Sequence, residues 1–132
     1  MGKNILYVED NPDNMLLVKR VLQSRGYCVL EAKNGSEGIA IAQSQDVDLI
    51  LLDINLPDID GYEVARRLRS SSIPKLVYIP IIAITANALK GDAEKALEAG
   101  CNVYMSKPIN IRELGARVEA FVASPKGSNI SL

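Results

Sequence analysis

The sequence predicts an α/β protein, a (βα)5 chain that folds into a doubly wound, five-stranded parallel sheet. Two observations lead to this fold. Short apolar runs recur along the chain, and several are continuously apolar, as strands buried on both faces of a parallel sheet are. Amphipathic segments with helical spacing separate these runs, so that strands and helices alternate. A chain of 132 residues with 48% hydrophobic residues is long enough for one domain with its own core.

Five short segments are predicted as strands because each is rich in apolar residues and too short for a helix. They cover residues 4–8, 28–32, 48–52, 79–84 and 102–105. The first, third and fourth contain the continuously apolar runs, so we expect both of their faces to be buried.

Five helices are predicted between and after these strands, over residues 14–26, 36–45, 61–71, 91–100 and 110–124. We expect Ser36 and Asn110 to lie at helix starts and Gly26 and Gly100 at helix ends, with the fourth helix starting near Asp92. The expected buried faces consist of Leu17, Val21 and Leu22 in the first helix, Val64 and Leu68 in the third, and Ile111, Leu114, Val118 and Val122 in the fifth. Phe121 is expected in the core, and Tyr7 and Tyr27 are interpreted as structural.

Composition excludes several classes of function. A net charge of −1 disfavours a nucleic-acid or anionic-membrane surface. The two cysteines, Cys28 and Cys101, are far apart and fit a reduced cytoplasmic protein. No apolar run approaches the roughly 18 residues that indicate a membrane span, and the N-terminus lacks the pattern of a signal peptide. We therefore expect a soluble cytoplasmic domain over residues 1–123, followed by a flexible tail over 124–132.

The sequence contains no histidine. A histidine general base, a histidine-ligated metal, a Ser-His-Asp triad and a phosphohistidine within this chain are therefore excluded.

Polar residues follow the predicted strands at the edge where parallel strands end together. Glu9 and Asp10 follow the first strand, Asp53 the third, Thr85 the fourth, and Ser106, Lys107 and Pro108 the fifth. Ligands of doubly wound sheets bind at this edge. Two carboxylates about 4 Å apart repel by roughly 4 kcal/mol at an effective dielectric constant near 20. Three carboxylates at one edge therefore indicate a cation, and an all-oxygen site favours Mg²⁺.

A carboxylate beside Mg²⁺, a lysine and a hydroxyl can act as a nucleophile toward phosphorus and form an aspartyl phosphate. Asp53 is the candidate because it ends a buried, rigid strand, and in-line attack requires accurate placement. Pro57 and Gly61 then turn the chain away from the site.

Four segments resemble one known family. "ILYVEDNPDN", "DLILLDINLPDIDGYEVARRLR", "IPIIAITANALKGD" and "EAGCNVYMSKPI", in this order and at this spacing, are similar to the receiver domain of two-component response regulators, over about residues 3–123. The nearest resemblance is to stand-alone cell-cycle receivers and to receivers of hybrid sensor kinases. This resemblance implies the flavodoxin-like strand order 2-1-3-4-5.

The resemblance also implies roles for individual residues. Asp53 would be the phospho-acceptor, and Lys107 the counter-charge of the phosphate, with Lys107–Pro108 as a cis peptide. Asp10 would bind Mg²⁺ directly, Asn55 would bind it through its backbone carbonyl, and Glu9 would contact it only through water. Thr85 and Tyr104 would form a conformational switch. Asn55 and Asn87 are expected to tune the lifetime of the phosphate by orienting or blocking water.

The expected function is that of a single-domain response regulator that takes its phosphoryl group from a histidine kinase or a histidine phosphotransfer protein. About nine residues follow the fifth helix, so we expect the signal to leave through the surface of the fourth helix, fifth strand and fifth helix, around 89–98 and 104–114, toward a partner protein. No nucleic-acid or membrane partner is expected. A receiver excised from a hybrid kinase and an unphosphorylated pseudo-receiver remain as alternatives.

Two further classes share features of this pattern. A flavodoxin-like electron carrier would need a Ser/Thr/Gly-rich loop after the first strand, where "EDNPDN" would repel a flavin phosphate. A phosphatase with an aspartate nucleophile would need a second carboxylate at the position of Asn55. Both classes are therefore disfavoured.

Overall fold

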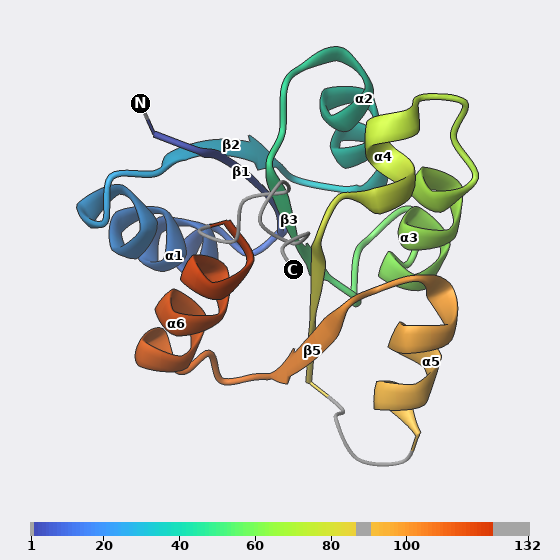
Figure 1. The fold of residues 1–132 in the computed structure, drawn as a ribbon. Helices are drawn as coiled ribbons and strands as arrows, with labels where there is room; N and C mark the ends of the chain where they lie inside the picture. Colours follow the sequence, from blue (N-terminus) through green and yellow to red (C-terminus); the bar gives the residue numbers. More distant parts are fainter. Residues whose placement is uncertain (1, 87–90, 123–132) are drawn as a thin grey trace, which may run out of the picture.

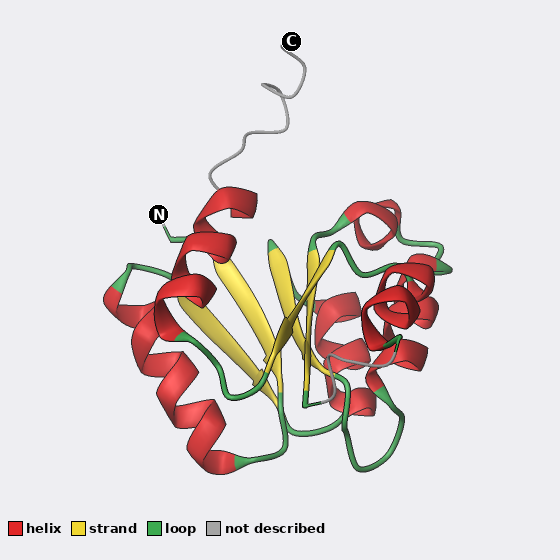
Figure 2. Cartoon of the chain, turned by 90° about the horizontal axis from the view of Figure 1, so that it is seen from below, coloured by secondary structure: helices red, strands yellow, loops and turns green. Residues whose placement is uncertain are grey.

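The computed structural model describes residues 2–86 and 91–122. Its centre is a parallel sheet with helices on both faces (Figures 1 and 2). The strands are β1 (Asn4–Val8), β2 (Cys28–Ala32), β3 (Leu49–Asp53), β4 (Ile81–Thr85) and β5 (Val103–Ser106). They pair in the order β2-β1-β3-β4-β5, which confirms the predicted fold and strand order.

The first two strands have the predicted bounds, whereas β3, β4 and β5 each end one residue later than predicted. Asp53 and Thr85 are therefore the last residues of their strands and do not follow them. The backbone ladder continues past the apolar run, because Asp53 pairs with Ile84 and the N–H of Ile54 donates to the carbonyl of Ile84 at 3.0 Å. A polar side chain does not end a strand as long as its backbone still pairs with a neighbour.

The described residues form six helices, one more than predicted. They are α1 (Pro12–Ser24), α2 (Gly35–Ser44), α3 (Gly61–Arg69), α4 (Pro74–Tyr78), α5 (Asp92–Ala99) and α6 (Ile111–Val122). The extra helix, α4, has five residues, begins with a proline and buries Leu76 against the sheet. A segment this short carries less than two helical periods, so its sequence pattern does not distinguish it from a loop.

Two predicted helix starts differ in outcome. Asn110 caps α6 as expected, because its Oδ1 accepts the N–H of Glu113 at 3.0 Å. Ser36 lies in the first turn of α2 but does not cap it, so the expected position of the cap was wrong. Asn34 caps α2, since its Oδ1 accepts the N–H of Glu37 at 2.8 Å. Asparagine and serine are both good caps, and the backbone conformation selects between them.

The buried faces of the helices also differ in part from the prediction. Val64, Leu68, Leu114 and Val118 are buried as expected. In α1, however, the buried residues are Met15, Val18 and Leu22, and Leu17 is 40% exposed. Ile111 is 41% exposed at the first turn of α6, and Phe121 and Val122 are half-buried at its end. A helix that is apolar over more than half its circumference does not by itself reveal which stripe contacts the sheet.

Two hydrophobic cores lie on either side of the sheet, between it and the helices that cover each face in Figure 2. One lies under α1 and α6 and is called here the α1/α6 core. The other lies under α2, α3, α4 and α5. Side chains alternate between the two cores along each strand, and β1, β3 and β4 are buried on both faces along nearly their whole length. This rigid centre presents the ends of three strands to one edge.

Within residues 2–86 and 91–122, no helix is both long enough and apolar enough to cross a membrane. Cys28 is exposed, Cys101 is buried, and both are free thiols. The predicted tail over 124–132 and Asn87 lie outside the described residues.

Candidate functional site

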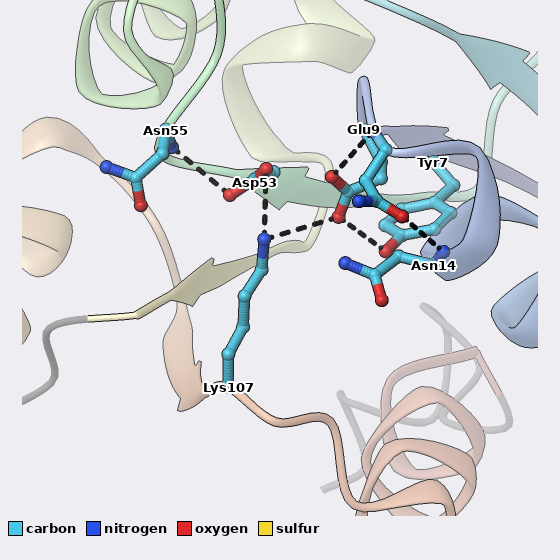
Figure 3. Close-up of polar contacts among 7 residues, drawn as sticks. Tyr7, Glu9, Asn14, Asp53, Asn55 and Lys107 are labelled. Atoms are coloured by element: carbon cyan, nitrogen blue, oxygen red, sulfur yellow. Dashed lines mark hydrogen bonds and ion pairs between the residues drawn. The ribbon is translucent and has the colours of Figure 1, made fainter.

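The carboxyl ends of β1, β3 and β5 bring four charged side chains together, as the sequence predicts. Figure 3 shows three of them, Glu9, Asp53 and Lys107. One carboxylate oxygen from each of Glu9, Asp10 and Asp53 lies within 4.8 Å of the other two. The Nζ of Lys107 lies 3.2 Å from Oδ2 of Asp53 and 3.5 Å from Oε1 of Glu9. We call these four residues the acidic cluster.

Asp53 is held by partners on both of its oxygens and is only 1% exposed. Its Oδ1 accepts the backbone N–H of Asn55 at 3.1 Å, and its Oδ2 accepts from Lys107. Gly61 packs directly behind it: a Cβ at Gly61 would lie 2.7 Å from the Asp53 carbonyl oxygen and 2.7 Å from the Cα of Ile54. Only glycine lets α3 start this close to the end of β3.

Glu9 is as deeply buried as Asp53 and has three donors around its carboxylate. The hydroxyl of Tyr7 donates to Oε1 at 2.9 Å, and Lys107 approaches the same oxygen at 3.5 Å. The backbone N–H of Asn11 donates to Oε2 at 3.1 Å, and the side chain of Asn11 also caps α1 by accepting the N–H of Asn14 at 2.9 Å. The start of α1 is therefore tied to the acidic cluster (Figure 3).

Sequence reasoning missed Tyr7 as part of the site. Its ring is fully buried in the α1/α6 core, and only its hydroxyl reaches the acidic cluster. The signal was available, because side chains two residues apart on a strand lie on the same face and a buried tyrosine hydroxyl needs a partner. Tyr7 precedes Glu9 by two residues.

The electrostatics of the cluster favour a bound cation. Burial, and next the negative charge of Glu9, raise the pKa of Asp53 from 3.8 to about 6, although the N–H of Asn55 and the ammonium of Lys107 oppose this rise. Burial and then Glu9 also raise the pKa of the Tyr7 phenol well above its usual range, so Tyr7 stays protonated and acts as a donor. The ionised carboxylate of Asp53 is therefore unfavourable at this edge unless a cation binds beside it.

The donor set fits Mg²⁺. Three carboxylates and one ammonium leave two negative charges, and the ligand atoms that these described residues offer are carboxylate oxygens. Mg²⁺ prefers such oxygens and keeps several waters, so it needs few protein ligands. Asp10 is exposed whereas Glu9 and Asp53 are buried, so the cluster opens to solvent on the side of Asp10.

Thr85 lies next to the cluster, but its hydroxyl is engaged on another helix. It is 2% exposed, and its Oγ1 donates to Oδ2 of Asp92, the first residue of α5, at 3.2 Å. Its carbonyl accepts the N–H of Lys107 at 2.8 Å, which links β4 to the lysine. Tyr104 is half-buried and pairs with Ala83, so its ring lies on the same face of the sheet as Thr85.

Two further expectations concern the backbone and the asparagines. The Lys107–Pro108 peptide bond is cis, as expected. The side chain of Asn55 is exposed at the rim of the acidic cluster (Figure 3).

Known proteins resemble this chain along nearly its whole length. The model of the response regulator receiver domain matches residues 5–119. The polar-differentiation response regulator DivK of Brucella anthropi is 38% identical over 122 residues, which are 92% of this chain and 98% of DivK.

Two solved structures share the fold with a TM-score of 0.86 each. One is the receiver domain of the sensor histidine kinase PA1611 from Pseudomonas aeruginosa, which is 40% identical, covers 94% of this chain and 100% of that one, and has a magnesium ion coordinated in its active-site cleft. The other is a complex of the Saccharomyces cerevisiae histidine phosphotransfer protein Ypd1 with the receiver domain of its downstream response regulator Ssk1, at 30% identity over 93% of this chain and 90% of that one. The chain described here belongs to the response regulator receiver domain family.

Proposed function

We propose that this receiver accepts a phosphoryl group on Asp53 from a phosphohistidine of a histidine kinase or a histidine phosphotransfer protein. One observation carries the proposal: Asp53 is a buried carboxylate that lies beside two further acids and has Lys107 3.2 Å from one oxygen. The donor histidine lies outside this sequence, because the sequence contains none. The two free thiols support a reducing compartment, the cytoplasm, as the place of this reaction.

The transfer exchanges one bond for another. An oxygen of Asp53 attacks the phosphorus in line, the phosphorus–nitrogen bond breaks, and the imidazole leaves with that electron pair. We assign Asp10 and Asp53 as direct Mg²⁺ ligands, Asn55 as a ligand through its backbone carbonyl, and Glu9 as a partner of a metal-bound water. When bound, the ion supplies positive charge to the phosphoryl oxygens. Lys107 can follow the phosphate because its long side chain already reaches Asp53.

The phosphate is lost by hydrolysis. A water attacks the phosphorus in line, which regenerates the carboxylate of Asp53 and releases inorganic phosphate. A side chain at the rim of the site can orient or block that water. The exposed side chain of Asn55 is placed for this role, and we assign the same role to Asn87. Changing either residue should alter the dephosphorylation rate while phosphorylation still occurs. Unchanged rates in both variants would contradict the assignment.

Mass spectrometry tests the phosphorylation directly. After incubation with acetyl phosphate and Mg²⁺, the wild type and the control variant Asp13→Asn, which removes an exposed carboxylate from α1, should each gain one phosphate. The variant Asp53→Asn should gain none, and removal of Mg²⁺ with EDTA should prevent the gain in the wild type and in Asp13→Asn. Phosphate on Asp53→Asn would refute the assignment. A wild type that gains no phosphate from acetyl phosphate or from any phosphohistidine donor would support the pseudo-receiver alternative.

We further propose that Thr85 and Tyr104 convert phosphorylation into a change of the surface formed by α5, β5 and α6. A phosphate brings about two negative charges and three acceptor oxygens, which can draw the Thr85 hydroxyl away from Asp92. Space then opens on the face of the sheet that Tyr104 shares. The exposed side chains of Leu97 on α5 and Ile111 on α6 support a protein partner there. A net charge of −1 supports a partner other than nucleic acid.

The variant Thr85→Ala separates the two halves of this proposal. It should still accept phosphate, because Asp53 and Lys107 are unchanged. Its affinity for the partner protein should no longer depend on phosphorylation. A variant whose partner affinity responds as fully as that of the wild type would show that Thr85 is not part of the switch.

A further inference from the structure

Tyr7 contributes a single polar atom to a position that is otherwise apolar. Its ring is 0% exposed and belongs to the α1/α6 core, together with Met15 and Val18 of α1 and Met105 of β5. Only the hydroxyl leaves this environment, and it donates to Oε1 of Glu9 at 2.9 Å (Figure 3). A phenylalanine would satisfy the packing equally well, so the hydroxyl requires a separate explanation.

We infer that Tyr7 is a positioning residue of the cation site, whose hydroxyl holds the Glu9 carboxylate in place for a metal-bound water and keeps it from turning to Lys107. This inference deepens the proposed function, because it concerns the Mg²⁺ site on which the phosphorylation of Asp53 depends. Tyr7 would not touch the metal or the phosphate and would act only through Glu9.

The first argument is the difference between the two donors to Oε1 of Glu9. The Tyr7 hydroxyl is the nearer, at 2.9 Å, and its position is set by a ring that the core surrounds on all sides. Lys107 lies at 3.5 Å, its side chain is 22% exposed, and it also pairs with Asp53 at 3.2 Å. A rigid donor determines where an oxygen lies, whereas a flexible and shared donor does not.

The second argument is the need of Glu9 for a partner that remains in place. Glu9 is 1% exposed, and a buried carboxylate without donors is costly. When Lys107 turns to the phosphate, as proposed above, Oε1 of Glu9 loses that neighbour. Tyr7 still donates to it, and the N–H of Asn11 still donates to Oε2 at 3.1 Å. Both carboxylate oxygens of Glu9 therefore keep a donor while the lysine moves.

The third argument is that removal of the hydroxyl has a defined consequence. Without it, the ammonium of Lys107 is the remaining side-chain donor in contact with Oε1, so the carboxylate should turn toward the lysine. Mg²⁺ then competes with a tighter ion pair. Loss of a group that orients a metal ligand typically lowers metal affinity about 10–100-fold, and because Tyr7 acts through a water-linked carboxylate we expect a loss at the lower end, about 10-fold.

Calorimetric titration of the unphosphorylated protein with Mg²⁺ tests the inference. The proteins are the wild type, Tyr7→Phe, Glu9→Gln and the double variant, with Tyr27→Phe as the matched control, since Tyr27 packs against the same core. Tyr7→Phe should bind about 10-fold more weakly in the wild-type background and within about 2-fold of its parent in the Glu9→Gln background. Tyr27→Phe should bind as the wild type does. Equal Mg²⁺ affinity of Tyr7→Phe and wild type, or the same loss in both backgrounds, would overturn the inference.

Thermal denaturation of each variant ensures that affinity is measured on folded protein, and proton NMR of the wild type provides a test that needs no variant. The hydroxyl proton of Tyr7 should exchange slowly with solvent and its signal should shift during the Mg²⁺ titration. A rapidly exchanging hydroxyl, or a signal that Mg²⁺ leaves unchanged, would overturn the inference. These measurements use no phosphate. Failure of Asp53 to accept phosphate would therefore refute the proposed function alone, and equal Mg²⁺ affinities would refute the role of Tyr7 alone.

Discussion

Replacement of Asp53 by asparagine should stabilise the protein at neutral pH when no Mg²⁺ is present. Asp53 is 1% exposed, and burial together with Glu9 raises its pKa from 3.8 to about 6 in the folded state. An acid whose pKa is raised by folding binds its proton more tightly in the folded state than in the unfolded one. The stability that it contributes is therefore full below its unfolded pKa, near 3.8, and is lost as the pH rises through about 6.

The size of the effect follows from the two pKa values. One pKa unit corresponds to about 1.4 kcal/mol, so the charged form of Asp53 costs the folded state about 3 kcal/mol at pH 7 and less than about 1 kcal/mol at pH 4. Asparagine has nearly the same shape and carries no charge, so Asp53→Asn removes this cost. The free energy of unfolding of the variant should exceed that of the wild type by about 3 kcal/mol at pH 7, and the difference should nearly vanish at pH 4.

Urea denaturation in EDTA at a series of pH values between 4 and 7 measures this difference. Glu98→Gln is the matched control, because it removes one negative charge from an exposed position on α5. Addition of Mg²⁺ should then stabilise the wild type, by about 2.7 kcal/mol at a concentration 100 times the dissociation constant, and should stabilise Asp53→Asn less. An Asp53→Asn variant no more stable than the wild type at pH 7, or a difference between them that does not depend on pH, would refute the reasoning.

Three further substitutions have expected outcomes. Gly61→Ala places a methyl group 2.7 Å from the Asp53 carbonyl oxygen, so the end of β3 must shift. Both the urea midpoint and the rate of phosphorylation should fall. An unchanged rate would show that the shift does not reach the Asp53 carboxylate. Asp92→Ala removes the carboxylate that accepts from the Thr85 hydroxyl. The affinity of the unphosphorylated protein for its partner, measured by calorimetry, should therefore approach that of the phosphorylated wild type. An unchanged affinity would contradict the role of this hydrogen bond. Leu51→Ala leaves a cavity in the α1/α6 core and should lower the free energy of unfolding by about 2–5 kcal/mol in urea denaturation, with phosphorylation at Asp53 retained.

The local pattern of the sequence determined the number of strands and their alternation with helices, whereas their order in the sheet was implied by the resemblance to receiver domains. Apolar runs such as the one that leads into Asp53 can be recognised within about five residues, because burial on both faces of a strand requires apolar side chains at every position. The alternation with helices then permits few topologies, since parallel strands need crossover connections. Parallel strands end at one edge, so Glu9, Asp10, Asp53 and Lys107 could be grouped from their positions alone.

Only the tertiary structure decided which neighbours these residues have. The strand that contains Thr85 ends where pairing with β5 ends, and the hydroxyl of Thr85 contacts Asp92, seven residues later on another element. The buried stripe of α1 consists of Met15, Val18 and Leu22, because the sheet selects one of several apolar stripes.

Tyr7 shows the same limit inside the site. The apolar pattern of β1 does not say which groups from other segments come within reach of the Tyr7 hydroxyl and of its acceptor. The sequence by itself determined that Tyr7 is buried in β1, because that depends on the strand in which it lies. The spacing of two residues also makes Glu9 a candidate partner for its hydroxyl. The approach of Lys107 to the same oxygen, in contrast, is decided by the path of the chain after β5. Hydrogen bonds and ion pairs depend on distances of a few ångströms between segments far apart in the chain, and only the folded structure sets those distances.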